Sequence, residues 1–77
     1  MGISDNVSGR GTINVKQLIQ ISINMQYLTH LDISCCATVD DSAVDCLYNL
    51  KFINVWMANG ITKSKRNEMM QKGIVVI

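Results

Sequence analysis

The chain has 77 residues, enough for one small domain that buries only about 60% of its unfolded surface. Its formal net charge of +1 gives no general electrostatic reason to bind nucleic acid or a membrane surface. No run of about 18 apolar residues occurs, and no basic segment leads into an apolar run at the start, which argues against a membrane span and a signal peptide.

The first expected unit covers residues 1–27. Residues 7–13 align with residues 33–39 at a spacing of 26 and predict a short strand followed by a turn. Asn14 is then the expected helix N-cap, because its side chain can accept a hydrogen bond from a free backbone N–H group. The helix runs to about Met25, with Leu18 and Ile21 on its buried face.

The second unit, residues 28–49, carries the clearest pattern. Leu28, Leu31 and Ile33 are expected to point to one side and His30, Asp32 and Ser34 to the other, as in a short strand with one buried face. Asp40 is the expected N-cap of the following helix, which includes Leu47 at helical spacing. This unit therefore predicts strand, turn and helix in succession.

The third unit, residues 50–77, repeats the same pattern at a spacing of 22. The strand recurs from Leu50 to Val55, Thr62 is the expected N-cap, and Met69 takes the buried helix position. A last short strand is expected over residues 74–77.

The three units share one interval between strand and helix. Six residues separate the last buried strand position from the residue before the helix cap, in the pairs Val7 and Ile13, Ile33 and Val39, and Val55 and Ile61. Recurrence in phase is typical of stacked structural repeats. The sequence therefore predicts an α/β segment of three helices and four strands over residues 1–77. A small mixed domain with accidental apolar periodicity is the alternative.

The stretch Leu28-Thr-His-Leu-Asp-Ile-Ser-Cys-Cys36 and the segment from Val39 to Leu50 resemble leucine-rich repeats, in particular the cysteine-containing subclass of F-box leucine-rich-repeat proteins. The resemblance implies a solenoid with a short parallel sheet on the inner face, helices outside and Cys36 in the core. Arg10 and Ala58 replace this cysteine in the other units. The last unit resembles a terminal repeat, so the chain looks like the C-terminal part of an array that no F-box precedes.

Cysteine placement predicts free thiols in the interior. Cys35 and Cys36 are adjacent, which is poor geometry for a disulfide, and Cys46 makes the number odd. Zinc is disfavoured because there is no Cys-x-x-Cys pair and His30 lies on the other side of the strand from Cys36. We therefore expect no metal or other cofactor and a reducing intracellular compartment, with cytoplasm, cilium and mitochondrion not distinguished.

The free side of the predicted sheet is the expected binding face, because the outward side chains of a solenoid form columns with one residue per repeat. Phe52 and Trp56 both face outward and are candidate anchors for a partner, worth roughly 2 kcal/mol or more each when desolvated. Alternatively, they only cover neighbouring side chains. Ser4 and Val76 are expected at the two ends of the column that contains Phe52. The predicted partner-binding residues are His30, Asp32, Ser34, Phe52, Asn54 and Trp56.

Catalysis is not expected on this face. A strand holds His30, Asp32 and Ser34 in a line, with neighbours about 7 Å apart, whereas a nucleophilic triad must converge in a cleft that excludes water. The row is therefore interpreted as a polar binding strip, and no catalytic residue is predicted.

The last helix carries a possible basic patch of Lys63, Lys65 and Arg66 close to its N-terminus, where the helix dipole disfavours cations. An acidic protein surface or a phosphate backbone would compensate for this charge. A solvated helix face is the simpler interpretation, and no interleaved aromatic residues favour RNA.

Three functions remain as hypotheses. We expect a non-catalytic protein interaction module, a structural or adaptor subunit of a larger complex such as a ciliary axoneme or a mitochondrial membrane complex. The resemblance implies a second possibility, the substrate-recognition repeats of an F-box type cullin-RING ubiquitin ligase receptor. The third is a binder of RNA or of an acidic surface through the last helix. The expected partners are proteins, with nucleic acid disfavoured and no small-molecule substrate.

Overall fold

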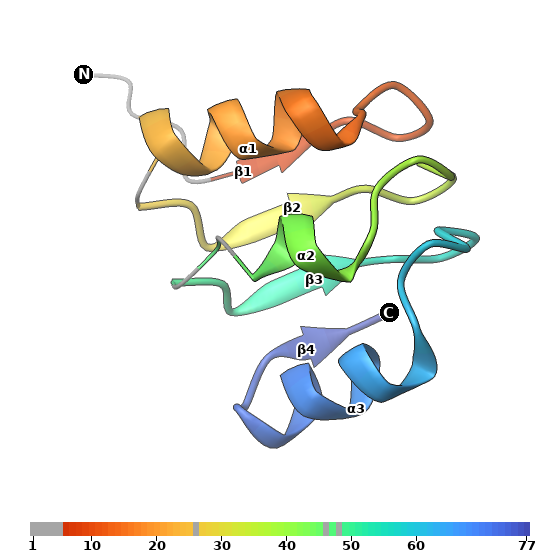
Figure 1. Ribbon diagram of the computed structural model, residues 1–77. Coiled ribbons are helices and arrows are strands. Elements are labelled where there is room, and N and C mark those ends of the chain that lie inside the picture. The colour runs from red at the N-terminus through yellow and green to blue at the C-terminus, as the bar shows by residue number, and fades with distance from the viewer. Residues whose placement is uncertain (1–5, 26, 46, 48) are drawn as a thin grey trace.

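Strands and helices alternate along the computed structural model, which describes residues 6–25, 27–45, 47 and 49–77. The elements are β1 (Asn6–Ser8), α1 (Val15–Asn24), β2 (His30–Asp32), α2 (Asp41–Val44), β3 (Phe52–Asn54), α3 (Lys63–Gln71) and β4 (Val75–Val76). The strands form one parallel sheet in the order β1-β2-β3-β4, and the helices lie along one side of it (Figure 1). The predicted α/β class, with four short parallel strands alternating with helices, is confirmed.

The helices begin where the polar caps predict. The Asn14 side chain accepts a hydrogen bond from the Gln17 backbone, and the Gln17 side chain accepts one in return from the Asn14 backbone. Asp40 and Thr62 cap α2 and α3 in the same way, each by accepting a hydrogen bond from a backbone N–H three residues on. α2 ends before Leu47, which was expected to belong to it and instead lies in the turn that follows.

The core lies between the sheet and the helices. Its fully buried side chains come from the strands and the turns after them and from α1, and those of the strands alternate as the period-two pattern predicts. The largest of them are Leu18, Leu31, Ile33, Ile53, Val39 and Val55. All belong to one cluster with members from the three repeats, so the core is continuous along the stack.

The register of the first repeat differs from the prediction. Val7 lies opposite Leu31, a spacing of 24 residues and not 26, and the Gly9 N–H donates to the Asp32 carbonyl. Gly9 therefore occupies the strand position that Ile33 occupies in the second repeat. Only four residues separate it from Ile13, whereas the later repeats have intervals of six.

Gly9 is required because this first turn is short. A Cβ atom at Gly9 would lie 2.0 Å from Cδ1 of Ile13, so the Ile13 side chain fills the space that the strand side chain fills in the later repeats. The sequence pattern does not reveal this shift, because a slip of two residues keeps every side chain on the same face of the sheet.

The last strand is also shifted, by one residue. Phe52 lies opposite Val75, and Val76 lies opposite Ile53, so the expected pairing of Val76 with Phe52 is wrong. α3 ends in a turn at Gly73, whose φ of 87° is a conformation that glycine adopts without strain, and this turn sets the start of β4. Ser4, the expected first member of the same column, lies outside the described residues.

The turns that follow the strands also stack. Gly11, Cys35 and Met57 hold equivalent positions and share a left-handed backbone, with φ of 69°, 62° and 60°. The Gly11 N–H donates to the Ser34 carbonyl and the Cys35 N–H donates to the Trp56 carbonyl, both at 2.8 Å. These bonds extend the sheet ladder beyond the strands, so neighbouring turns are held at a fixed separation.

Gly60 lies where two neighbouring turns approach most closely. A Cβ atom there would lie 2.1 Å from the carbonyl oxygen of Val39, which is backbone and cannot rotate away. We expect Gly60→Ala to lower the free energy of unfolding by about 2–3 kcal/mol, as for other overpacked sites. Urea denaturation followed by circular dichroism measures this, and Asn59→Ala, at an exposed neighbour, is the control. Equal midpoints for the two variants would contradict the tight stacking of the turns.

Candidate protein-binding face

The sheet face opposite the helices carries two columns of partly exposed side chains. Because Leu31 and Ile53 point into the core, their strand neighbours point the other way. Asn6, His30, Phe52 and Val75 form the first column, and Ser8, Asp32 and Asn54 form the second. The open side of the sheet therefore carries His30, Asp32, Phe52 and Asn54, which is the orientation predicted for them.

His30 and Phe52 form an aromatic pair at one end of this face. Their ring centroids lie 5.8 Å apart and the planes are inclined by 24°, so the rings stack across neighbouring strands. Nδ1 of His30 also lies 2.8 Å from the Thr29 hydroxyl, which fixes the ring from its other side. Beside the pair, a shallow hollow of about 260 Å³ opens over β1 and β2, with Asn6, Asp32 and Phe52 in its lining.

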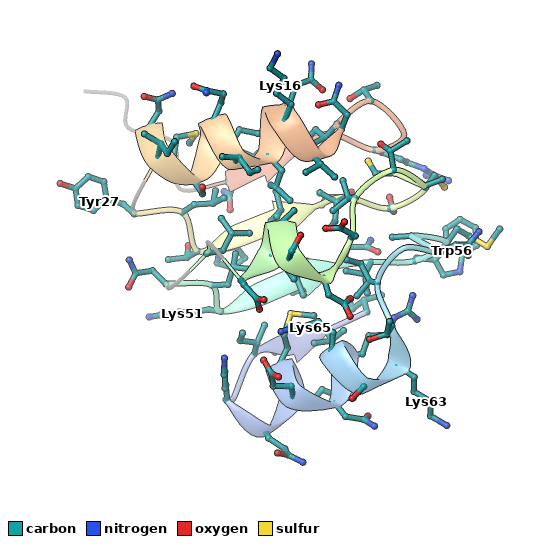
Figure 2. The ribbon with its side chains drawn as sticks, viewed as in Figure 1. Lys16, Tyr27, Lys51, Trp56, Lys63 and Lys65 are labelled. Atoms are coloured by element: carbon teal, nitrogen blue, oxygen red, sulfur yellow. The ribbon has the colours of Figure 1, made fainter. Side chains whose placement is uncertain are left out.

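Arg10 and Trp56 form a second pair at the opposite end, where the strands turn toward the helices. The Arg10 guanidinium lies 5.6 Å from the centroid of the Trp56 ring, within the range of a cation–π interaction. The corrected register places Arg10, Ser34 and Trp56 at equivalent positions, and Ser34 is small enough for Arg10 to reach across it. Trp56 is 53% exposed and projects from the molecule (Figure 2).

Arg10 is a residue of this face that the sequence reasoning missed. The assumed spacing of 26 put Ser8 in the column with Trp56 and gave Arg10 the position of the core cysteine. With a spacing of 24, Thr12 takes that position, and Arg10 falls on the open side. The sequence is compatible with both spacings, 24 and 26, because the two registers bury the same face of the strand.

Asp32 and Asn54 brace the turns that follow their strands. The Asp32 side chain accepts hydrogen bonds from the Ser34 backbone N–H at 2.9 Å and from the Ser34 hydroxyl at 2.7 Å. Asn54 accepts the equivalent bond from the Trp56 backbone N–H at 3.0 Å. The Ser34 hydroxyl, aided by the Arg10 charge, holds the pKa of the Asp32 carboxyl below its usual range, so Asp32 is an anion at neutral pH.

The predicted strip therefore divides into exposed and structural residues. Ser34 is only 3% exposed, so its expected place on the open surface is wrong. Its side chain folds back onto Asp32, because the chain already turns inward at this residue. His30, Phe52 and Trp56 remain available on the open face, with Asp32 and Asn54 half-buried between them.

The three basic residues of α3 do not share one exposed surface. Nζ of Lys65 binds the Asp45 and Glu68 carboxylates, and its side chain is only 11% exposed. These carboxylates raise the pKa of Lys65, and Lys65 in turn lowers the pKa of Glu68. Arg66 reaches back toward the turn after β3, with Nη2 lying 3.3 Å from the Val55 carbonyl oxygen. Lys63 alone projects freely into solvent (Figure 2).

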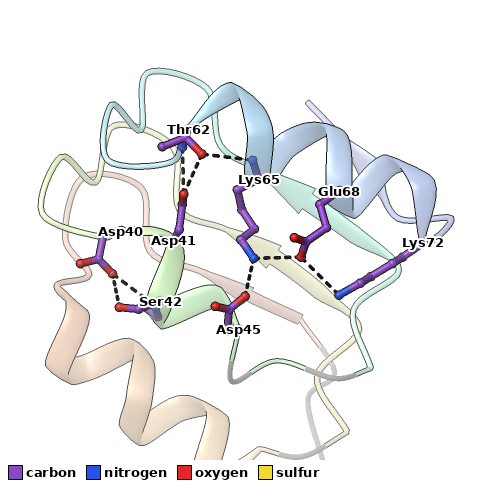
Figure 3. Close-up of polar contacts among 9 residues, drawn as sticks. Asp40, Asp41, Ser42, Asp45, Thr62, Lys65, Glu68 and Lys72 are labelled. Atoms are coloured by element: carbon purple, nitrogen blue, oxygen red, sulfur yellow. Dashed lines mark hydrogen bonds and ion pairs between the residues drawn. The ribbon is translucent and has the colours of Figure 1, made fainter.

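The contacts of Lys65 belong to a polar seam that joins the second and third repeats. Asp41, the first residue of α2, accepts hydrogen bonds from the Thr62 backbone N–H at 2.9 Å and from the Thr62 hydroxyl at 2.6 Å (Figure 3). Thr62 is itself the cap of α3, so one helix start positions the next. Of the three cations near the N-terminus of α3, Lys65 is thus balanced by carboxylates within the chain.

Cys36 has a structural role. Its buried thiol lies 3.1 Å from the carbonyl oxygen of Gly9 in the preceding turn, to which it donates a hydrogen bond. Cys35 is a free, half-buried thiol, and Cys46 lies outside the described residues. In the described part of the chain, no three side chains of histidine, cysteine, aspartate or glutamate gather closely enough to hold a metal ion.

Searches against protein-family models, curated proteins and solved structures return no match to this chain. Among the described residues, none of the helices has the length and apolar character that crossing a lipid bilayer requires.

The Ser34 hydroxyl should control the pKa of the Asp32 carboxyl. We expect Ser34→Ala to raise the pKa of Asp32, because its largest stabilising hydrogen bond is lost. Because the folded-state pKa lies below the unfolded one, this interaction stabilises the fold above the unfolded pKa and loses its effect as pH falls through the folded pKa. The stability deficit of Ser34→Ala should therefore shrink in acid.

Carbon-13 NMR titration of the aspartate carboxyls measures this effect. Ser42→Ala is the matched control, because the Ser42 hydroxyl lowers the pKa of Asp40 in the same way. Each variant should move only its own aspartate. An unchanged Asp32 pKa in Ser34→Ala would show that the bond is not formed.

Two lysines of α3 should differ in their effect on stability. We expect Lys65→Ala to lower the urea midpoint more than Lys63→Ala, because only the former leaves Asp45 and Glu68 without their shared cation. The difference should narrow at high salt, which screens the ion pairs. If the two variants unfolded at the same urea concentration, the ion pairs of Lys65 shown in Figure 3 would contribute nothing to stability.

Proposed function

We propose that this chain is a leucine-rich-repeat module of the cysteine-containing subclass that binds a protein partner through its open sheet face. It acts without catalysis, as a structural or adaptor part of a larger complex. The observation that carries this proposal is the pairing of exposed aromatic residues at both ends of a face that no helix covers.

The geometry of the face favours a protein ligand. The His30–Phe52 pair and the Arg10–Trp56 pair lie about four residues apart along the strands, or roughly 13 Å. The polar groups of Asp32 and Asn54 lie between them. Aromatic and arginine side chains flanking a polar centre are the composition that dominates binding energy at protein interfaces. A partner segment running along the strand direction would contact both pairs at once.

The assignment to leucine-rich repeats is supported by the place of Cys36. Its thiol bonds the carbonyl of the preceding turn, which gives a cysteine at this position a reason tied to the stacking of repeats. Ala58, at the same place one repeat later, is fully buried. The substrate-recognition end of an F-box ubiquitin ligase receptor remains one version of this proposal.

Two sets of contacts argue against catalysis on the open sheet face and against RNA binding through α3. The Ser34 hydroxyl donates to Asp32 while His30 contacts Thr29 and Phe52, so the row does not form a base–nucleophile pair. Lys65 and Arg66 are engaged within the chain, which weakens the case for RNA binding through α3.

Affinity purification with quantitative mass spectrometry tests the proposal. The baits are the natural chain and the double variant Phe52→Ala with Trp56→Ala. Each anchor is worth about 2 kcal/mol or more, so the double variant should recover specific partners at least tenfold less well.

The matched control is Lys63→Ala with Gln71→Ala, which alters two exposed residues of α3 and should leave recovery unchanged. Two-dimensional NMR spectra of both variants establish that each is folded. If the folded aromatic double variant captured the same partners as the natural chain, the open sheet face would not be the binding surface.

A further inference from the structure

The N-terminal end of the stack differs from the joints within it. β1 pairs with β2 on one side, and no strand lies on its other side in the described part of the chain. Val7 is only half-buried, whereas its equivalents in the next two repeats, Leu31 and Ile53, are 1% and 0% exposed. The first repeat therefore carries a core position that the later repeats fully bury.

A groove of about 620 Å³ opens at this end between β1 and α1. Val7, Ile13 and Ile21 give it an apolar floor, and Lys16 and Gln20 stand at its rim. Lys16 projects outward from α1 at this end of the molecule (Figure 2). The groove thus combines aliphatic side chains with a cationic border.

The chain itself shows what covers this surface one repeat further on. The equivalent side of the second repeat is covered by the first, through the β1–β2 ladder, the packing of α1 against α2 around the fully buried Leu18, and the Cys36 bond to Gly9. The third repeat is covered by the second in the same manner. Each joint thus places a strand–turn–helix unit on the surface that β1 and α1 leave open.

The backbone of β1 is oriented for the same ladder. The carbonyls of Asp32 and Ser34 accept hydrogen bonds from Gly9 and Gly11 of the preceding repeat, both at 2.8 Å. Their equivalents one repeat earlier are Ser8 and Arg10. Because successive residues of a strand direct their backbone groups to alternate sides, the Ser8 amide and the carbonyls of Ser8 and Arg10 point to the open edge. The Arg10 amide is different, because its equivalents at Ser34 and Trp56 donate to the Asp32 and Asn54 side chains of their own turns.

The C-terminal end differs from the groove in its helix. α3 buries only Met69 and presents mainly polar side chains along its length, among them Ser64, Asn67 and Gln71, while Met70, Val75 and Ile77 are the exposed apolar residues of this end. A polar outer helix is typical of a capping repeat. A second copy stacked head to tail would press this polar helix against the aliphatic groove, so the geometry favours a different occupant.

We propose that the N-terminal edge is a docking site for a strand–turn–helix unit of a leucine-rich partner. Its strand adds parallel to β1, its aliphatic side chains fill the groove over Val7, Ile13 and Ile21, and an acidic group meets Lys16. This surface is separate from the open sheet face, so either proposal can fail without the other.

In the test, such a strand–turn–helix unit is built into the chain itself, next to the N-terminal edge. A second copy of residues 28–51 is inserted directly before Asn6 in the full chain, which reproduces the natural spacing of 22 from strand to strand. A control insert of the same length carries Leu31→Asp and Ile33→Asp in the inserted copy. Amide hydrogen exchange of Ser8 and Arg10 is followed by NMR, and the mass of the natural chain is measured by light scattering at several concentrations.

With the apolar insert, exchange at Ser8 should slow at least tenfold and the urea midpoint should rise, because a docked unit pairs the edge and covers the groove. Arg10 is the reference amide, because its equivalents bond within their own turns. The polar insert should produce neither effect. Unchanged Ser8 exchange with the apolar insert would overturn the proposal, as would slow Ser8 exchange already in the monomeric natural chain. A concentration-dependent dimer that protects the Ser8 amide would overturn the proposed occupant in favour of a second copy.

Discussion

Each strand–turn–helix unit of this protein is too small to bury its own apolar face, and the stacking of one unit on the next is what makes a core possible. The constraint acts at three levels at once. The strands pair in parallel, the turns bond through Gly11 and Cys35, and α2 and α3 join through Asp41 and Thr62. Because strands, turns and helices are all bonded to their neighbours, the backbone has little room to shift locally, and Gly60 leaves no space for an added side chain.

The same constraint creates the open sheet face. Once the helices occupy one side of the sheet, the other side must present one side chain per repeat in columns, whatever their chemistry. His30 meets Phe52 because they are one repeat apart, and Arg10 meets Trp56 because they are two repeats apart with a small serine between them. The side chains that brace the turns, Asp32 and Asn54, hold the two aromatic pairs apart.

The sequence predicted the elements better than their alignment. Asn14, Asp40 and Thr62 cap helices as expected, since capping depends on a few neighbouring residues. The offset of the first strand was misjudged because alternation with period two is satisfied equally by spacings of 24 and 26. The spacing of 24 brings Ile13 into the space that a Cβ at Gly9 would occupy, and this close approach exists in three dimensions alone. The ion pair of Lys65 with Asp45 joins two repeats, and no local pattern encodes it. The burial of Ser34 and the contact of Arg66 with the Val55 carbonyl depend on how the turns after β2 and β3 fold.

The stacking register can be measured directly through the scalar couplings that cross backbone hydrogen bonds, in NMR spectra of the isotope-labelled chain. The account predicts couplings from the Gly9 nitrogen to the Asp32 carbonyl carbon and from the Cys35 nitrogen to the Trp56 carbonyl carbon. A coupling from Val7 to the Asp32 carbonyl would restore the spacing of 26 and remove Arg10 from the binding face. Loss of both predicted couplings in the folded chain would contradict the stacked repeats themselves.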